Sequence, residues 1–480
     1  MEKKRQSITG VKGVSGVSPG AVLFVVCSAL FLMPFMLSAV AVALPTIGRD
    51  LQASALQVGL VETVYILSVA VFLLPMGRFG DVFGRRRVFL QGIFFFTLAT
   101  ALIALSTSIE MLIGWRILQG IGAAMVNASS LAIVVSVFPA EKRGRVLGIA
   151  IGTVYAGISC GPPVGGFLTG SFGWRAVFLP GVLLGLLSWL LTLTRMRTEW
   201  HEAAGEPFDW RGSLIYALAV ACITLGGARL SSGGWATAVL TAGLVGLGLF
   251  VLVERRSRYP VLDIRLLTGN RVFALSNVAA FINYGSTFGV VFFMSLYLQY
   301  VKGFRPADAG LVLMLQPLVQ MLLAPVGGRL SDRFPPARVA TIGMTLCCFG
   351  LLLAATIAPG TPVAVVVGAL LLLGLGYAFF STPNTSVIMG CLPRRYLGVA
   401  SGLTGTMRSL GMTFSMVVVT LSFSFFMEGR TISPATIPEF MASMQTDMLF
   451  FSGLSVVGIG CSLGRLSFSG GQECRGDDEL

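Results

Sequence analysis

The sequence predicts an all-α membrane protein built from two six-helix bundles, with two further helices inserted between them. Three observations lead to this fold class: the mean hydropathy is +0.84, fourteen long apolar runs follow one another along the chain, and a charged motif occurs twice. Of the 480 residues, 55% are hydrophobic and only 11% are charged. A soluble protein of this length could not bury so much apolar surface, whereas a bilayer accommodates apolar helices of about 20 residues.

The apolar runs have the lengths expected of membrane-spanning helices. The first is too long for the core of a signal peptide and no clear cleavage site follows it, so we expect it to be a retained helix. We expect the fourteen helices at residues 20–44, 57–77, 88–106, 111–136, 145–169, 174–194, 211–230, 234–254, 272–298, 308–327, 338–358, 361–383, 397–423 and 446–467.

The charged motif lies between the second and third runs and recurs in the second half of the chain. Gly77-Arg-Phe-Gly-Asp-Val-Phe-Gly-Arg-Arg-Arg-Val88 matches Gly328-Arg-Leu-Ser-Asp-Arg-Phe-Pro-Pro-Ala-Arg-Val339 at six of twelve positions, with an offset of 251 residues. Repeats on this scale are typical of transporters built from two related halves. A second series recurs at an offset of 254 with its spacing intact: Pro139, Gly144, Gly148 and Gly157 correspond to Pro393, Gly398, Gly402 and Gly411.

The two offsets determine how the chain is organised. Because they differ by only three residues, the first six helices correspond to the last six, and the seventh and eighth are an insertion. We therefore expect a tail at 1–19, a first bundle at 20–194, an inserted helix pair with its linkers at 195–271, a second bundle at 272–467 and a tail at 468–480.

The basic residues are distributed unevenly along the chain. There are 34 Lys and Arg and 21 Asp and Glu, giving a net charge of +13. With the N-terminus in the cytoplasm, 26 of the basic residues fall in cytoplasmic segments, 6 in outer segments, and Arg116 and Arg408 within helices. This asymmetry follows the positive-inside rule. It predicts a multi-pass protein of the cell membrane with both termini cytoplasmic, and no nucleic-acid partner is needed to explain the charge.

The repeated motif places a carboxylate among arginines at a helix end. Charge-assisted contacts of this kind can hold or release an adjoining bundle, and glycines permit a tight turn and close helix approach. The alternative is that the arginines only fix the topology. We predict a gating latch formed by Gly77, Asp81, Gly84, Arg85, Arg86, Arg87 and, in the second half, Asp332.

Several motifs together resemble the major facilitator superfamily, specifically its fourteen-helix drug:proton antiporter branch. Residues 77–88 are similar to the signature that follows helix 2, 112–124 to the helix 4 motif with a buried arginine, and 157–166 to the helix 5 motif associated with antiporters. The resemblance covers most of the chain and implies export in exchange for protons. At one position the chain departs from the branch, because Met36 stands where an aspartate is usual, seven residues before Ala43-Leu-Pro.

The helix 5 motif combines proline with closely spaced glycines. Proline breaks the helical hydrogen-bond ladder, and glycine lets a neighbouring helix approach closely. We predict a kinked helix at the seam between the halves, which seals one side against leak. The alternative is an ordinary proline kink, which is common in membrane helices. The residues concerned are Gly157, Gly161, Pro162, Gly165 and Gly166.

Charges within the lipid span are few, so each is a candidate site. Glu62 and Arg116 lie at a similar depth from the outer ends of their helices and are the only opposite pair so placed in the first half. We predict that Glu62 carries the proton and that Arg116 is its partner. The alternative is that Glu62 reaches the outer interface and takes no part in transport.

Polar residues at mid-helix positions predict a central cavity, although amides can equally join helices to one another. Arg408 lies near the middle of the bilayer, and no acidic residue falls clearly within the last six helices. It therefore pairs with Glu62, meets an anionic group of the substrate, or caps backbone carbonyls. The candidate cavity residues are Met36, Asn127, Asn277, Asn283, Gln316, Gln320 and Arg408.

The sequence thus predicts a secondary transporter that exports an amphipathic small molecule, neutral or anionic, in exchange for protons. A proton-coupled importer or facilitator and a membrane sensor without transport are the alternatives. No phosphate-binding loop of ATP-driven pumps occurs. With one histidine and eight cysteines without metal-type spacing, we expect no metal, no cofactor and no enzyme activity. We expect a monomer whose partners are the substrate, protons and the lipid bilayer.

Overall fold

A computed structural model describes residues 18–230, 233–427, 430 and 432–469 of the chain. The tail predicted at 1–19 lies almost wholly outside these residues, as does the tail predicted at 468–480. Within the described ranges the chain forms helices joined by loops and contains no β-strand.

Fourteen helices in the described residues are long and apolar enough to cross a membrane, and each corresponds to one predicted run. The predicted number of spans is confirmed. Helices α9 and α11 are short, and α11 continues into α12. The helices are α1 (Pro19–Asp50), α2 (Ala55–Phe83), α3 (Arg85–Ala104), α4 (Ile109–Val137), α5 (Arg143–Phe172), α6 (Phe178–Arg195), α7 (Trp210–Ala228), α8 (Gly234–Glu254), α9 (Ile264–Gly269), α10 (Arg271–Leu296), α11 (Pro306–Leu313), α12 (Leu315–Arg333), α13 (Pro336–Ala355), α14 (Val363–Gly390), α15 (Leu397–Met427) and α16 (Ile437–Ser469).

Polar caps explain where several of these helices begin. The Ser54 hydroxyl accepts from the Gln57 amide and the Gln57 side chain accepts from the Ser54 amide, a reciprocal pair that starts α2. Asp209 accepts from the Gly212 amide at 2.8 Å at the start of α7. These side chains satisfy amides that have no partner within the first turn.

Helix α16 is longer than predicted at its start, and this corrects one expectation. It begins at Ile437, nine residues before the apolar run at 446–467. Asp447 therefore lies ten residues inside the helix and is buried, so the expectation of no acidic residue within the last six helices was wrong. Arg465 lies within the predicted run 446–467 but was counted with the cytoplasmic basic residues; it is fully buried in α16.

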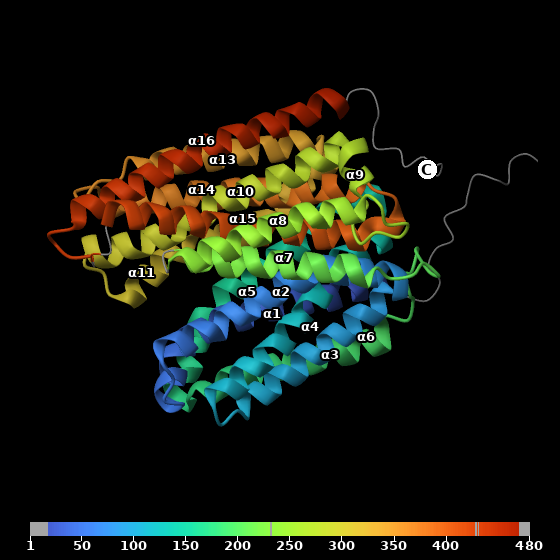
Figure 1. The fold of residues 1–480 in the computed structure, drawn as a ribbon, viewed down its shortest axis with the longest axis horizontal. Helices are drawn as coiled ribbons and strands as arrows, with labels where there is room; N and C mark the ends of the chain where they lie inside the picture. The colour runs from blue at the N-terminus through green and yellow to red at the C-terminus, as the bar shows by residue number, and fades with distance from the viewer. Residues whose placement is uncertain (1–17, 231–232, 428–429, 431, 470–480) are drawn as a thin grey trace, which may run out of the picture.

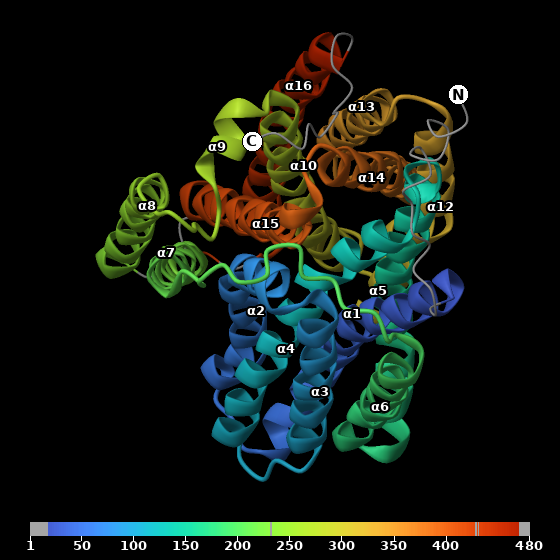
Figure 2. The ribbon, with the colours of Figure 1, turned by 90° about the vertical axis from the view of Figure 1, so that its right-hand side faces the viewer.

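The helices form two bodies with a hairpin beside them. Helices α1–α6 lie in one body and α10–α16 in the other (Figures 1 and 2). Helices α7 and α8 pack on each other, and α7 contacts α2 of one body and α15 of the other. The buried Tyr216 hydroxyl on α7 lies 2.8 Å from the Thr406 hydroxyl on α15 and donates to the Ala70 carbonyl of α2 at 3.2 Å.

The two bodies meet at one end of the molecule. We call this the basic end: it carries the 77–88 turn, the 196–209 segment and α9, and the opposite end carries the turns at 51–54, 105–108 and 356–362. The bodies converge at the basic end and spread apart toward the opposite end (Figure 1). Helix α2 packs on α15 and α5 on α12, each pair joining one body to the other.

Candidate functional site

At the basic end, Asp81 joins the two bodies. This carboxylate is fully buried and accepts hydrogen bonds from the backbone amides of Gly398 at 2.9 Å and Val399 at 3.0 Å, in the first turn of α15. A helix N-terminus favours a negative charge. Arg85, also fully buried, lies 2.6 Å from Asp81 and donates to the Arg394 carbonyl beyond the seam. Close packing of Gly77 on the Gly398 backbone brings the helices near enough for these bonds.

The second copy of the motif makes the matching contact. Asp332 at the end of α12 accepts from the amides of Gly144 at 2.7 Å and Arg145 at 2.8 Å, in the first turn of α5. Pro336 occupies the position that corresponds to Arg85, so no buried arginine accompanies Asp332. The two contacts are related by the internal repeat, and of the two the Asp81 contact is the one in which the described residues of the motif form an ion pair.

The other arginines of the motif have different partners. The Arg86 amide donates to Glu199 at 2.8 Å, and Arg87 lies 3.7 Å from the same carboxylate. Both therefore hold the 196–209 segment rather than the other body. This segment runs across the basic end between the bodies (Figure 2).

Glu206 in the same segment was missed by the sequence reasoning. Its carboxylate pairs with Arg78 at the end of α2 and, at 3.2 Å, with Arg395 before α15. It thus links the two bodies a second time beside the Asp81 contact. Its sequence signal is weak, because acids in polar linkers are common.

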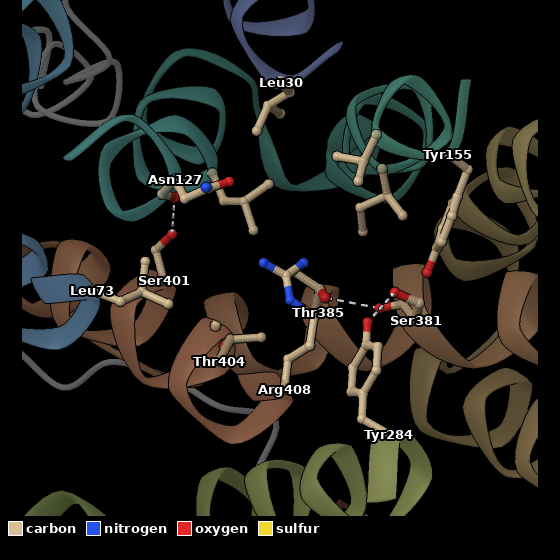
Figure 3. A pocket seen from close by; sticks show the side chains of 14 residues that line it. Leu30, Leu73, Asn127, Tyr155, Tyr284, Ser381, Thr385, Ser401, Thr404 and Arg408 are labelled. Carbon is tan, nitrogen blue, oxygen red and sulfur yellow. Dashed lines mark hydrogen bonds between the residues drawn. The ribbon is translucent and has the colours of Figure 1, made fainter. Parts of the chain in front are cut away.

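A cavity of about 60 Å³ is lined by residues from helices of both bodies (Figure 3). The Arg408 guanidinium lies in the centre of the cavity. Arg408 is the charged residue among those that line it. The volume admits only a few water molecules, so a drug-sized ligand needs more room than this. The lining residues are Leu30, Leu73, Asn127, Leu131, Ile151, Val154, Tyr155, Tyr284, Ser381, Thr385, Ser401, Thr404, Gly405 and Arg408.

Hydroxyl groups surround the guanidinium on the side of the second body. The Tyr284 hydroxyl lies 3.3 Å from that of Ser381, and Thr385 donates to the Ser381 carbonyl at 2.8 Å. Tyr155 of the first body points toward the same place (Figure 3). These groups can donate to oxygen atoms of a ligand. These residues could not be picked out from the sequence, because hydroxyl side chains occur throughout membrane helices.

Two of the predicted cavity residues, Asn127 and Arg408, line this cavity, and five do not. Met36 is buried and faces Gly181 of α6 within the first body. The Asn277 amide donates to the Phe273 carbonyl of its own helix, α10. Asn283 is also buried on α10, as are Gln316 and Gln320 on α12. A substrate contact for any of these seven residues remains a prediction.

Glu62 and Arg116 each lie seven residues into their helices from the opposite end, at matching depth. They do not form the direct pair that the depth suggested. Arg116 is fully buried, donates to Gln119 at 2.8 Å and lies 5.4 Å from the centre of the Tyr65 ring. Its remaining guanidinium nitrogens have no hydrogen-bond partner in the described part of the chain, so Glu62 interacts with it only through space.

The helix 5 motif packs against its own body. A Cβ atom at Gly161 would meet Ser38 and lie 2.9 Å from backbone atoms of Phe35 and Ala39, all on α1. Gly157 and Gly165 likewise approach the α1 backbone. Helix α5 does lie at the predicted seam, where it packs on α12 of the other body, but the glycines of the motif face α1 of their own body. The first turns of α5 are the part that meets α12 of the other body. A Cβ atom added at Gly148 would lie 2.6 Å from the Ala324 carbonyl oxygen.

The glycines of α5 therefore differ in how well they tolerate a larger side chain. We expect Gly161→Ala to lower the free energy of unfolding by about 1–3 kcal/mol, because its methyl group meets α1 backbone that cannot move aside. Gly170→Ala is the matched control, since nothing lies within 4 Å of its Cβ position. Thermal unfolding of the purified variants tests this, and equal melting temperatures would contradict it.

The comparisons with known proteins agree with this architecture. The model of the Major Facilitator Superfamily matches residues 26–416. The chain belongs to this superfamily. It is 30% identical over 413 residues to the riboflavin transporter RibZ of Clostridioides difficile, covering 85% of this chain and 89% of the relative. It is 32% identical over 383 residues to the multidrug resistance protein Stp of Mycobacterium tuberculosis, covering 79% and 71%.

A solved superfamily structure has the same fold. The human organic anion transporter MFSD10 superimposes with a TM-score of 0.68, at 15% identity, over 92% of this chain and 99% of that one. At this identity the likeness shows the fold alone. The chain is thus a multi-pass membrane protein with the fold of this transporter superfamily.

Proposed function

We propose that this superfamily member exports an amphipathic small molecule in exchange for protons by alternating access. The observation that carries the proposal is the position of Arg408. It lies in a cavity lined by both bodies, and two related contacts, which we take to be latches, join the bodies at the basic end. Opening the latches would expose the same cavity from the other side, as rocking of two halves about a midplane site requires.

The charges around the cavity favour a particular substrate. No acidic side chain lines it, and Arg408 makes no hydrogen bond or ion pair with another described residue. An unpaired guanidinium at membrane depth is costly, and a carboxylate or another oxygen-rich group would relieve that cost. We therefore favour a neutral or anionic compound with an apolar part over a dication.

The direction of transport rests on topology and on the relatives. The arginine-rich basic end belongs in the cytoplasm by the positive-inside rule, so the conformation seen is closed to the cytoplasm. One relative carries the name of a multidrug resistance protein and another that of a riboflavin transporter. Riboflavin has a polar chain on an apolar ring system, so it belongs among the first compounds to test.

The proton exchange is tested in inside-out vesicles under an imposed proton gradient. Proton efflux on addition of a transported compound establishes antiport, and we expect it to be abolished in Glu62→Gln, because the amide cannot carry a proton. Glu110→Gln, at the start of α4, is the control. Efflux that persists in Glu62→Gln moves the proton site elsewhere, and compound uptake without proton movement favours a facilitator.

A further inference from the structure

Asp447 is a buried carboxyl group in the second body that the proposed mechanism has not used. It lies ten residues into α16, about 15 Å from the start of the helix at the opposite end. Only 3% of its surface is exposed, and its Oδ2 atom has no hydrogen-bond partner among the described residues. It shares one face of α16 with Phe440, Met444 and Phe451, which are fully buried and three or four residues apart.

Among the residues that the structure describes, no positively charged side chain acts on Asp447. Helix α16 packs on α10, α13 and α15. The Ser422 hydroxyl of α15 is within hydrogen-bonding reach of the carboxyl group, and lies 2.8 Å from the Ser443 hydroxyl. Elsewhere on α16, Glu439 pairs with Arg430 at 3.2 Å, and Arg465 lies at the basic end, where it contacts Ser276 and Ser462.

The titratable groups of the neighbouring helices are engaged elsewhere or lie far along the helix. Tyr297 donates to the Ala358 carbonyl, and Cys348 approaches the Ser452 carbonyl. Arg408 lies fourteen residues before Ser422 on α15, about 21 Å along the helix. The other such groups on these helices are Arg271 and Arg338 at the basic end, Tyr284 at the central cavity and Cys347 beside Cys348.

A lone carboxylate in such a place is costly. Burying an ionised carboxyl group among apolar side chains without a cation costs far more than burying the neutral acid. The neutral form is the one that this environment accommodates. Acidic residues at membrane depth that face the interior of a bundle commonly mark proton pathways.

We propose that Asp447 is a second proton-binding carboxyl group of this transporter, located in the second body while Glu62 is in the first. It takes its proton from water at the opposite end and gives it up to the basic end when the bodies rock. The proposal rests on proton-coupled transport as proposed above. Helix α15 provides a physical connection, since it carries the Asp81 contact, Arg408 and Ser422 in that order.

The experiment measures proton binding without any substrate. The full-length chain is reconstituted in liposomes and titrated with acid and base while infrared difference spectra record the carbonyl stretch of protonated carboxyl groups. We expect Asp447→Asn to lack one band of the wild-type protein and to release about one proton fewer per chain over the titration. Glu439→Gln, an acid nearer the start of the same helix, is the matched control and should keep that band.

Two further measurements separate the possible failures. Asp447→Glu should restore the missing band at a shifted frequency, and the melting temperature of Asp447→Asn shows whether the variant is folded. An identical carboxyl band in wild type and folded Asp447→Asn would overturn the inference. If the wild type shows no coupled transport but Asp447→Asn still lacks the band, the proposed antiport is overturned and proton binding at Asp447 is not.

Discussion

Replacing Asp81 with alanine is expected to shift the protein toward a conformation that is open at the basic end, by about 100-fold or more in the equilibrium constant. The reason is that Arg85 would remain fully buried without its carboxylate. Breaking a buried pair in this way costs about 3–5 kcal/mol, and about 1.4 kcal/mol corresponds to a factor of ten. The Gly398 and Val399 amides at the start of α15 would also lose their acceptor.

The shift is measured as a distance between the two bodies. Spin labels at Arg195 on α6 and Arg338 on α13 are suitable, because both residues are exposed at the basic end and lie outside the latches. Double electron–electron resonance should report a longer distance in Asp81→Ala than in the otherwise unchanged protein. Transport should slow as well, because the closed basic end is a step of the cycle.

Asp332→Ala is the matched control for this prediction. It removes the equivalent two backbone contacts but leaves no buried arginine unpaired, and Asp332 itself is half-buried. We expect a smaller shift than in Asp81→Ala. Equal shifts in the two variants would show that the orphaned Arg85 is not the cause. An unchanged distance in Asp81→Ala would rule out the latch altogether.

Replacing Arg408 with alanine is expected to weaken binding of an anionic amphipathic compound by about 30-fold or more. Removing one partner of a buried charged contact costs about 2–5 kcal/mol, and each 1.4 kcal/mol is tenfold in the dissociation constant. A neutral amide analogue of the same compound should lose little affinity, since it makes no charged contact with the guanidinium. Fluorescence or calorimetric titration of the purified protein with both compounds measures the difference.

Two variants make the Arg408 prediction specific. Arg408→Lys keeps the charge and should retain part of the preference for the anion, although lysine lacks the planar fork of donors. Thr404→Val alters the cavity lining without changing its charge. If Arg408→Ala weakens both compounds equally, the guanidinium acts on the structure of the cavity and not on the anionic group.

The sequence revealed the membrane spans because lipid imposes a strong condition on them. Every span must present apolar side chains over about 20 residues, so all fourteen runs could be read directly. The same condition makes a helical segment hard to recognise when its polar residues are covered by neighbouring helices. The stretch before residue 446 includes Glu439 and Gln445 and appears too polar to span, yet α16 includes it because neighbouring helices cover it.

The internal repeat predicted that residues 77–88 and 328–339 have equivalent places, and the contacts of Asp81 and Asp332 are indeed equivalent. Which helix each carboxylate would meet could not be read from the sequence. The partners lie 317 and 188 residues away along the chain, and no local pattern encodes such a contact. The same holds for Glu206, whose two arginines come from different bodies.

By itself the sequence determined the number of membrane helices, the duplication and the family resemblance, because these depend on hydropathy and local spacing. Tertiary structure alone decided which polar residues meet. Depth along a helix placed Glu62 level with Arg116, but the direction of each side chain around its helix left them without a direct bond. The same packing brought Arg408 into the central cavity and buried Asp447 apart from the cations of the described residues, because side-chain direction is set only when the helices assemble.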